Sequence, residues 1–293
     1  MKHTRKLIPY LLIIALLLGG FLPQPVQAET DKPKTQAHAY YMVDAGSGKK
    51  ILSQNANKKI YPASTVKLMT ALVALEHART TQEIKYTKKL SKMIPSDAAA
   101  LNLRTGRTYN VRQYLHMLLM VSDAAAATAL SVGIAGSQEQ FVKWMNEKAA
   151  ALGMTKTSFD NPIGLDIGSG YHKTYTTASD FSKISRAAME NKTIRAIVAK
   201  HKYKVQPIGV KKSFVIQNTN AFYFAYKKMV KGAKYEIIGS KTGTTRAAGH
   251  ALVATARDEE GHEVICAFYG KGTHERLYQD VKKLFDYAFE QYQ

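Results

Sequence analysis

The chain has little cysteine and few acidic residues. One cysteine in 293 residues excludes an internal disulfide and a zinc site built from cysteines. Asp and Glu number 22 against 42 Lys and Arg, so the formal net charge at pH 7 is +20. This excess indicates an anionic partner or setting, but by itself it does not choose among nucleic acid, an anionic membrane and an anionic cell-wall polymer.

Composition also excludes several protein classes. Hydrophobic residues make up 45% and charged residues 22%, which is ordinary globular usage and argues against a disordered chain, a collagen-like fibre or a multi-span membrane protein. No internal repeat or low-complexity run follows residue 38. The length is sufficient for one large domain or two ordinary ones.

The first 28 residues differ from the rest of the chain. A basic start is followed by an apolar stretch from Leu7 to Leu22 and by small residues at Val26 and Ala28, which is typical of a secretory signal peptide. An uncleaved anchor is the alternative, although the stretch is short for a span of about 20 residues. We therefore predict a signal peptide over residues 1–28, a flexible polar leader over 29–38 and an exported domain over 39–293.

Cleavage would remove three cations and leave a charge of +17. Export argues against nucleic acid as a partner.

Hydrophobic periodicity predicts strands at both ends of the domain and helices between them. The expected strands are 40–43, 50–52, 235–239, 251–256 and 263–269; the expected helices begin at Ala63, Val111, Ser137 and Thr177, with a last one over 276–292. This order predicts an α/β domain of the α+β type, in which the end strands form one mostly antiparallel sheet.

Ser64 and Lys67 form an S-x-x-K element at an expected helix start. Residues three apart lie on the same helix face, so the lysine amine, if neutral, can take the serine proton. Backbone N–H groups at a helix start can also stabilise an oxyanion. Ser47 and Lys50 repeat the pattern in an expected hairpin turn, where nothing fixes the two side chains against each other.

Two further elements follow along the chain. Lys241-Thr242-Gly243-Thr244 comes at the end of an expected strand, where a lysine and a threonine could hold a substrate carboxylate and Gly243 would allow a substrate backbone to approach. An ordinary strand-end turn is the alternative. Ser122-Asp123-Ala124 follows an expected helix, and Ser122 is either a proton shuttle or an N-cap for the alanine-rich segment that comes next.

Together and in this order, the three elements resemble the motif set of penicillin-binding proteins and β-lactamases. The chain is similar to the D-alanyl-D-alanine carboxypeptidases among the low-molecular-mass penicillin-binding proteins, peptidase family S11. Beyond the motifs, the similarity includes 61–72, 161–165, 175–180, 241–249 and 251–256, and it runs from about Ala39 to Tyr292. It implies a β-lactamase/transpeptidase-like fold, with a mostly antiparallel sheet flanked by helices and a helical subdomain.

The resemblance also implies roles for the matching residues. Ser64 would attack the carbonyl between the two D-alanines that end a peptidoglycan stem peptide, with Lys67 as general base and Ser122 relaying a proton to the leaving D-alanine. Lys241 and Thr242 would bind the terminal carboxylate, and the backbone N–H groups of Ser64 and Thr244 would form the oxyanion hole. β-Lactam antibiotics would acylate the same serine. No metal or cofactor is implied. Such an enzyme acts in the cell envelope or outside the cell, at the outer face of the cytoplasmic membrane, where anionic wall polymers are candidate partners for the positive charge.

The sequence departs from the family at Ala124, where the second motif has an asparagine that helps to hold the lysine and the substrate amide. We therefore expect slower acylation, and a catalytically weak or inactive homologue that binds muropeptide or penicillin remains an alternative. A class A β-lactamase would also need a Glu-x-x-x-Asn element after the second motif, and none lies between Ala124 and Lys241.

Overall fold

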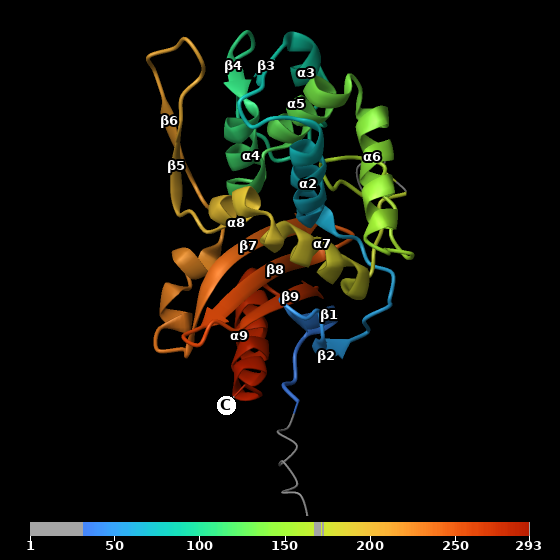
Figure 1. Cartoon of the computed structure of the whole chain (residues 1–293), viewed down its shortest axis with the longest axis vertical. Coiled ribbons are helices and arrows are strands. Elements are labelled where there is room, and N and C mark those ends of the chain that lie inside the picture. The colour runs from blue at the N-terminus through green and yellow to red at the C-terminus, as the bar shows by residue number, and fades with distance from the viewer. Residues whose placement is uncertain (1–31, 167–170, 172, 293) are drawn as a thin grey trace, which may run out of the picture. The chain divides into compact units, whose positions relative to one another are not determined.

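A five-stranded antiparallel sheet brings together strands from the first and the last part of the described residues (Figure 1). Its strand order is β2-β1-β9-β8-β7, and every neighbouring pair is antiparallel. The strands are β1 (Ala37–Asp44), β2 (Lys50–Gln54), β7 (Tyr235–Thr245), β8 (Gly249–Asp258) and β9 (Glu263–Gly270). The predicted antiparallel sheet of terminal strands is therefore confirmed.

The structure is a computed structural model that describes residues 32–166, 171 and 173–292. The signal peptide predicted over residues 1–28 lies outside these residues, as does the start of the predicted leader. The leader does not extend to residue 38, because β1 begins at Ala37 with a buried side chain. From Pro33 onward the chain forms a single unit of internal contacts.

The sheet is covered by helices on both faces. Along β9, Cys266 and Phe268 point into the core under helix α9 (His274–Glu290), whereas Ile265 and Ala267 belong to the core on the opposite face, under α7 (Ala178–Glu190). This alternation follows from the two-residue side-chain period of a strand. Burial on both faces explains why β9 is apolar throughout.

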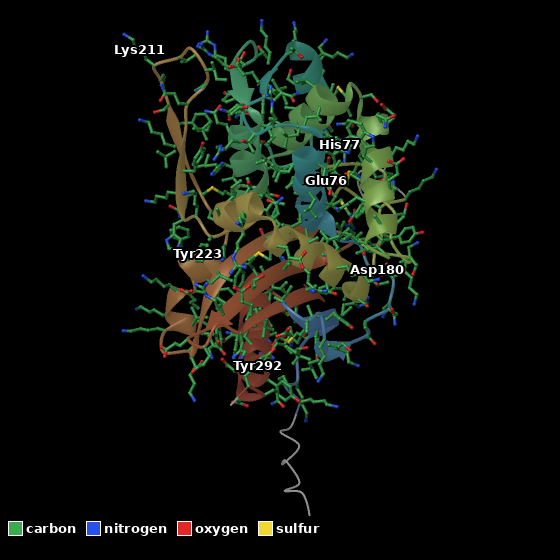
Figure 2. All side chains as sticks on the ribbon, in the orientation of Figure 1. Glu76, His77, Asp180, Lys211, Tyr223 and Tyr292 are labelled. Atoms are coloured by element: carbon green, nitrogen blue, oxygen red, sulfur yellow. The ribbon has the colours of Figure 1, made fainter. Side chains whose placement is uncertain are left out.

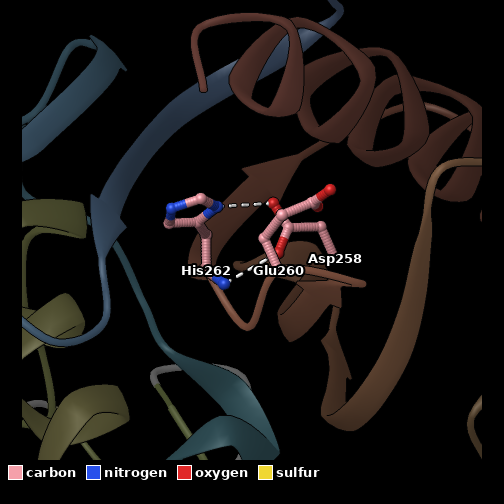
Figure 3. Close-up of side chains that lie close together, drawn as sticks. All are labelled: Asp258, Glu260 and His262. Carbon is pink, nitrogen blue, oxygen red and sulfur yellow. Dashed lines mark hydrogen bonds and ion pairs between the residues drawn. The ribbon is translucent and has the colours of Figure 1, made fainter. Parts of the chain in front are cut away.

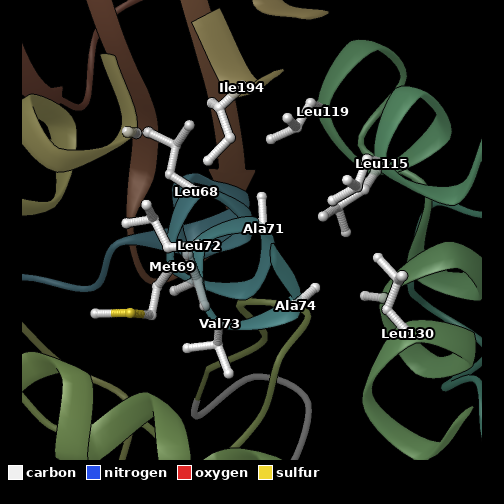
Figure 4. Close-up of a cluster of buried hydrophobic side chains, with 14 of the residues drawn as sticks. Leu68, Met69, Ala71, Leu72, Val73, Ala74, Leu115, Leu119, Leu130 and Ile194 are labelled. Carbon is white, nitrogen blue, oxygen red and sulfur yellow. The ribbon is translucent and has the colours of Figure 1, made fainter. Parts of the chain in front are cut away.

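A helical region is built around α2 (Lys67–His77), which contacts helices of this region on several sides (Figure 4). Its neighbours are α4 (Val111–Met120), α5 (Ala124–Ala135), α6 (Gln138–Ala151) and α7. Leu68, Leu72 and Leu119 are among the apolar side chains that pack there. This region is the helical subdomain that the resemblance implied, and it fixes α2 against the sheet.

Short elements complete the fold. They are the 3-10 turns η1 (Ala63–Val66), η3 (Ala221–Tyr223) and η4 (Lys227–Val230), the helices α3 (Lys88–Lys92) and α8 (Lys192–Val198), and the two-stranded pairs β3 (Glu83–Lys85) with β4 (Thr108–Asn110) and β5 (Lys202–Val205) with β6 (Phe214–Gln217). Within the described ranges, no helix has the length and apolar character needed to cross a bilayer.

Candidate active site

Ser64 and Lys67 meet where the 3-10 turn η1 passes into α2. Lys67 is the first residue of α2, and its Nζ donates a hydrogen bond of 2.9 Å to Ser64 Oγ. The serine side chain is partly exposed, whereas Lys67 is 1% exposed. A nucleophile open to solvent is therefore paired with an amine that is shielded from it.

Burial decides the charge state of Lys67. Desolvation lowers the pKa of Lys67 to about 7, and the negative charge of Asp123 opposes this shift. An amine with this pKa is present as the free base in a substantial fraction at neutral pH, so it can accept the proton of Ser64. The second S-x-x-K copy lacks this arrangement, because the Ser47 hydroxyl donates to Asp44 in an exposed turn.

The Lys67 amine has a second partner, which the sequence did not reveal. Its Nζ donates to the Ile163 carbonyl at 2.6 Å. Asn161 shapes this loop because its Oδ1 accepts from the backbone N–H groups of Ile163, Gly164 and Leu165. Gly164 has φ +90°, and a Cβ there would lie 2.1 Å from the Ala63 carbonyl oxygen. Residues 161–165 thus lie directly against the turn that carries the nucleophile.

Ser122 lies in the turn between α4 and α5 with a left-handed φ of 59°. Asp123, and not Ser122, caps α5, because its carboxylate accepts from the N–H groups of Ala125 and Ala126. The N-cap alternative for Ser122 is therefore wrong. The Ser122 hydroxyl instead accepts a hydrogen bond of 3.1 Å from Lys241 Nζ. Strained backbone of this kind costs free energy and is concentrated at functional sites.

The K-T-G residues lie inside a strand and not in a turn after it. β7 continues to Thr245, and Lys241 and Gly243 pair with Val253 and Ala251 of β8. The prediction of a strand that ends at Gly239 is wrong, because pairing with β8 extends it through a polar stretch. A Cβ on Gly243 would lie 2.9 Å from the Ser64 backbone nitrogen, so glycine is what lets β7 approach the nucleophile.

Lys241 is a second buried amine beside Lys67. It is 1% exposed, and its Nζ also donates to the Thr242 carbonyl at 2.6 Å. Burial, together with the positive charge of Lys67, holds the pKa of Lys241 well below its usual range. A bound carboxylate would supply the missing negative charge and favour the protonated form of Lys241.

The threonines of the same strand are more exposed than Lys241. Thr242 Oγ1 lies 3.3 Å from Thr219 Oγ1, and the exposed Thr244 has its Oγ1 3.1 Å from His250 Nδ1. The structure therefore brings together Ser64, Lys67, Ser122, Lys241, Thr242, Gly243 and Thr244 from three separate parts of the sequence.

Ala124 is the first residue of α5 and is fully buried. Asp123 cannot replace the missing amide, because its carboxylate is an acceptor and is already occupied by the N–H groups of Leu101, Ala125 and Ala126. Burial raises the pKa of Asp123 to about 6. Its contribution to the site is therefore a negative charge near Lys67.

A group of potential metal ligands lies on the β8–β9 hairpin (Figure 3). Ligand atoms of Asp258, Glu260 and His262 are within 4.8 Å of one another. Asp258 Oδ2 lies 2.8 Å from His262 Nδ1, and Asp258 Oδ1 accepts from the His262 backbone N–H at 2.7 Å. These bonds close the turn that the sequence predicted at 258–261. The reaction proposed below uses none of the three residues.

Comparisons with known proteins find similar sequences and structures over most of the chain. The family described as D-alanyl-D-alanine carboxypeptidase, peptidase S11, matches residues 26–272. The D-alanyl-D-alanine carboxypeptidase DacB2 of Mycobacterium tuberculosis is 32% identical over 263 residues, covering 88% of this chain and 84% of the relative. DacF of Bacillus subtilis is 28% identical over 289 residues, 96% of this chain and 70% of the relative. The Streptomyces K15 DD-transpeptidase structure has a TM-score of 0.79 at 27% identity and covers 88% of this chain and 99% of its own.

Proposed function

The chain belongs to the D-alanyl-D-alanine carboxypeptidases of peptidase family S11, and we propose that this serine peptidase uses Ser64 to release the terminal D-alanine of peptidoglycan stem peptides. The observation that supports this assignment is the 2.9 Å contact between Ser64 Oγ and the Nζ of the buried Lys67. A serine hydroxyl needs an adjacent base to act as a nucleophile, and Lys67 has a pKa lowered to about 7 by burial.

Acylation starts from the neutral Lys67 amine. The amine takes the Ser64 proton while Oγ bonds to the carbonyl carbon between the two D-alanines. Negative charge then develops on the carbonyl oxygen, which the backbone N–H groups of Ser64 and Thr244 would stabilise. Gly243 supports this assignment because it allows β7, with Thr244 next in line, to lie against the Ser64 backbone. Preorganised donors of this kind contribute about 3–4 kcal/mol each to transition-state stabilisation.

The second step expels D-alanine. The C–N bond breaks, and the proton that Lys67 took from Ser64 passes to the leaving amine through the hydroxyl of Ser122, which lies beside Lys241 Nζ. This transfer leaves Lys67 neutral again. Lys241 and Thr242 would hold the terminal carboxylate through a charged and a neutral hydrogen bond. Water then attacks the acyl-enzyme, its proton returns through Lys67, and Ser64 is regenerated. β-Lactams would form the corresponding ester on Ser64.

Ala124 favours a second candidate within the same family, a weak or inactive homologue that binds muropeptide or penicillin. The methyl group at this fully buried position cannot hydrogen-bond a substrate amide. Catalysis by this chain is then slower than with an asparagine in the motif, while the Ser64–Lys67 pair remains in place.

Mass spectrometry after incubation with penicillin tests the assignment. We expect a long-lived adduct on Ser64 and release of D-alanine from a stem pentapeptide. Ser64→Ala should abolish both, whereas Ser47→Ala, at the other S-x-x-K copy, should leave both unchanged. Rapid return to free enzyme would indicate a β-lactamase. An adduct without D-alanine release would indicate the binding homologue, and a chain without an adduct would contradict the assignment of Ser64.

We propose that residues 1–28 direct export and that the enzyme acts at the outer face of the cytoplasmic membrane. The relatives are named D-alanyl-D-alanine carboxypeptidases, and the anionic wall polymers that would surround such an enzyme outside the cell suit a net charge of +20, or +17 after cleavage. Binding to isolated cell walls should weaken as salt is raised, because screening shortens the reach of the charges. Binding that is independent of salt would contradict this electrostatic attraction.

A further inference from the structure

The loop of residues 161–166 contacts both of the segments that would form the oxyanion hole. On the side of the nucleophile, a Cβ on Gly164 would lie 3.0 Å from the Ser64 backbone nitrogen, so the loop backbone packs directly on the turn that carries Ser64. On the other side, the carboxylate of Asp166 accepts a hydrogen bond from Thr245 Oγ1 at the last residue of β7. One short loop therefore connects the turn before α2 to the end of the K-T-G strand.

The contact between Asp166 and Thr245 ties several backbone segments together. Asp166 is 2% exposed, and a buried carboxylate costs free energy unless hydrogen bonds compensate for it. Thr245 Oγ1 donates to Asp166 and accepts from the Ala248 N–H at 3.0 Å, so the same hydroxyl also fixes the turn between β7 and β8. The reaction proposed above uses neither of these two side chains.

The end of β7 is the part of the K-T-G strand that is most able to move. β7 is the outermost strand of the sheet; among the described residues it pairs with β8 alone, and this pairing ends at Thr245 opposite Gly249. Backbone at the end of an element opens more readily than backbone at its centre. Thr244, whose N–H is proposed for the oxyanion hole, comes one residue before this end. Asp166 therefore supports β7 from outside the sheet at the point where movement would displace Thr244.

We propose that Asp166 and Thr245 are positioning residues, which set the separation between the two N–H groups of the oxyanion hole. Gly164 fixes the loop against Ser64, and Asp166, two residues later, fixes the end of β7 beside Thr244. Oxyanion donors act only at the right distance, and a misplacement of about 1 Å can cost about a hundredfold in rate. This inference rests on the proposed function and adds to it two residues that lie outside the three motifs.

Thr245→Val removes the hydroxyl and keeps the branched shape of the side chain, whereas Thr245→Ser keeps the hydroxyl. The matched control is Thr157→Val, because the Thr157 hydroxyl likewise donates to a buried carboxylate, Asp180 Oδ2 at 3.0 Å. Asp180 is on α7, where Figure 2 labels it, and the proposed reaction does not use it. Stopped-flow measurement with a fluorescent penicillin gives the rate constant of acylation and the Kd of the initial complex, and thermal unfolding gives the stability.

We expect Thr245→Val to lower the rate constant of acylation by about tenfold, with the Kd of the initial complex and the pH midpoint unchanged, because the contacts of Lys67 stay in place. Thr245→Ser should recover most of the rate. Thr157→Val should lose similar thermal stability and keep the rate constant. Asp166→Ala should slow acylation at least as much as Thr245→Val. The double variant should be no slower than Asp166→Ala alone, because both residues act through one hydrogen bond.

Other outcomes overturn the proposal. Unchanged acylation in a folded Thr245→Val would show that the hydroxyl does not position β7, and an equal loss of rate in Thr157→Val would show that lowered stability alone slows the enzyme. A larger Kd with an unchanged rate constant would assign Thr245 to substrate binding, and additive losses in the double variant would mean that the two residues act independently. If the unmodified enzyme forms no adduct on Ser64, the proposed function is refuted and the inference with it; an active enzyme with an unaffected Thr245→Val refutes the inference alone.

Discussion

The charge state of Lys67 should control how acylation depends on pH. Burial lowers its pKa from 10.5 to about 7, so about half of the amine is the free base at pH 7. An exposed lysine would be neutral to only about 0.03% at that pH, a difference of roughly 1,500-fold. If the neutral amine is the base, the rate of acylation at subsaturating penicillin should rise about tenfold per pH unit below 7 and level off above it.

Stopped-flow measurement with a fluorescent penicillin between pH 5 and pH 9 gives this profile directly. Asp123→Asn provides a check on the cause, because the negative charge of Asp123 raises the pKa of Lys67. Removal of that charge should move the midpoint to lower pH. Asparagine caps a helix as well as aspartate, but it keeps one accepting oxygen where the Asp123 carboxylate uses both, so the variant should also lose about 1 kcal/mol of stability, which thermal unfolding measures separately.

Three results would refute the reasoning about Lys67. A rate that is independent of pH from 5 to 9 would exclude a titrating base in this range. A rate still rising at pH 9 toward a midpoint near 10 would mean that burial does not shift the amine. A rate that falls from pH 6 to pH 8 would assign the dominant titration to Lys241, whose contact with a carboxylate requires its proton.

Gly243→Ala should lower acylation at least tenfold, with the helical content unchanged by circular dichroism, because the added Cβ would lie 2.9 Å from the Ser64 nitrogen and push β7 away from the nucleophile. Ala124→Asn should raise acylation by about tenfold and lower the free energy of unfolding by about 1–3 kcal/mol, since the added amide must fit a fully buried site; unchanged acylation in a folded variant would contradict this. The free energy of unfolding should rise with pH between about 7 and 10.5, because in this range the unfolded state holds a proton on Lys67 that the folded state has lost. Chemical denaturation should show a smaller rise of this free energy for Lys67→Met.

Apolar patterning was enough to predict the central sheet and the long helices. The helix over 111–120 was predicted at its observed start, and β8 and β9 contain the expected strands 251–256 and 263–269. The extension of β7 through Lys241 was not predictable in the same way. Polar residues at 240–245 have no alternating apolar pattern, and they form a strand because β8 offers continuous backbone partners there. Tertiary pairing, and not local preference, decides that segment.

The side chains of the site were predictable because their motifs have a fixed order, whereas the backbone groups were not. Ser64, Lys67, Ser122 and Lys241 could be named from the sequence, and the structure brings them together. The Ile163 carbonyl could not be named as a partner of Lys67 from the sequence. Every residue has a backbone carbonyl, and only the fold determines which one lies next to the lysine amine. The nearest indication in the sequence was Asn161, whose side chain accepts hydrogen bonds from the backbone of the loop that contains Ile163.

The sequence departs from the family at Ala124, and the structure indicates which function of the family's asparagine is lost as a result. The missing asparagine would have held both the lysine and the substrate amide, but Lys67 is held here by Ser64 Oγ and by the Ile163 carbonyl. No contact of the Ala124 side chain is needed to keep the amine in place. Ala124 should therefore weaken the contact with the substrate amide and leave the position of Lys67 unchanged. We expect Ala124→Asn to raise the acylation rate without moving the midpoint of its pH dependence, because that midpoint is set by the burial of Lys67.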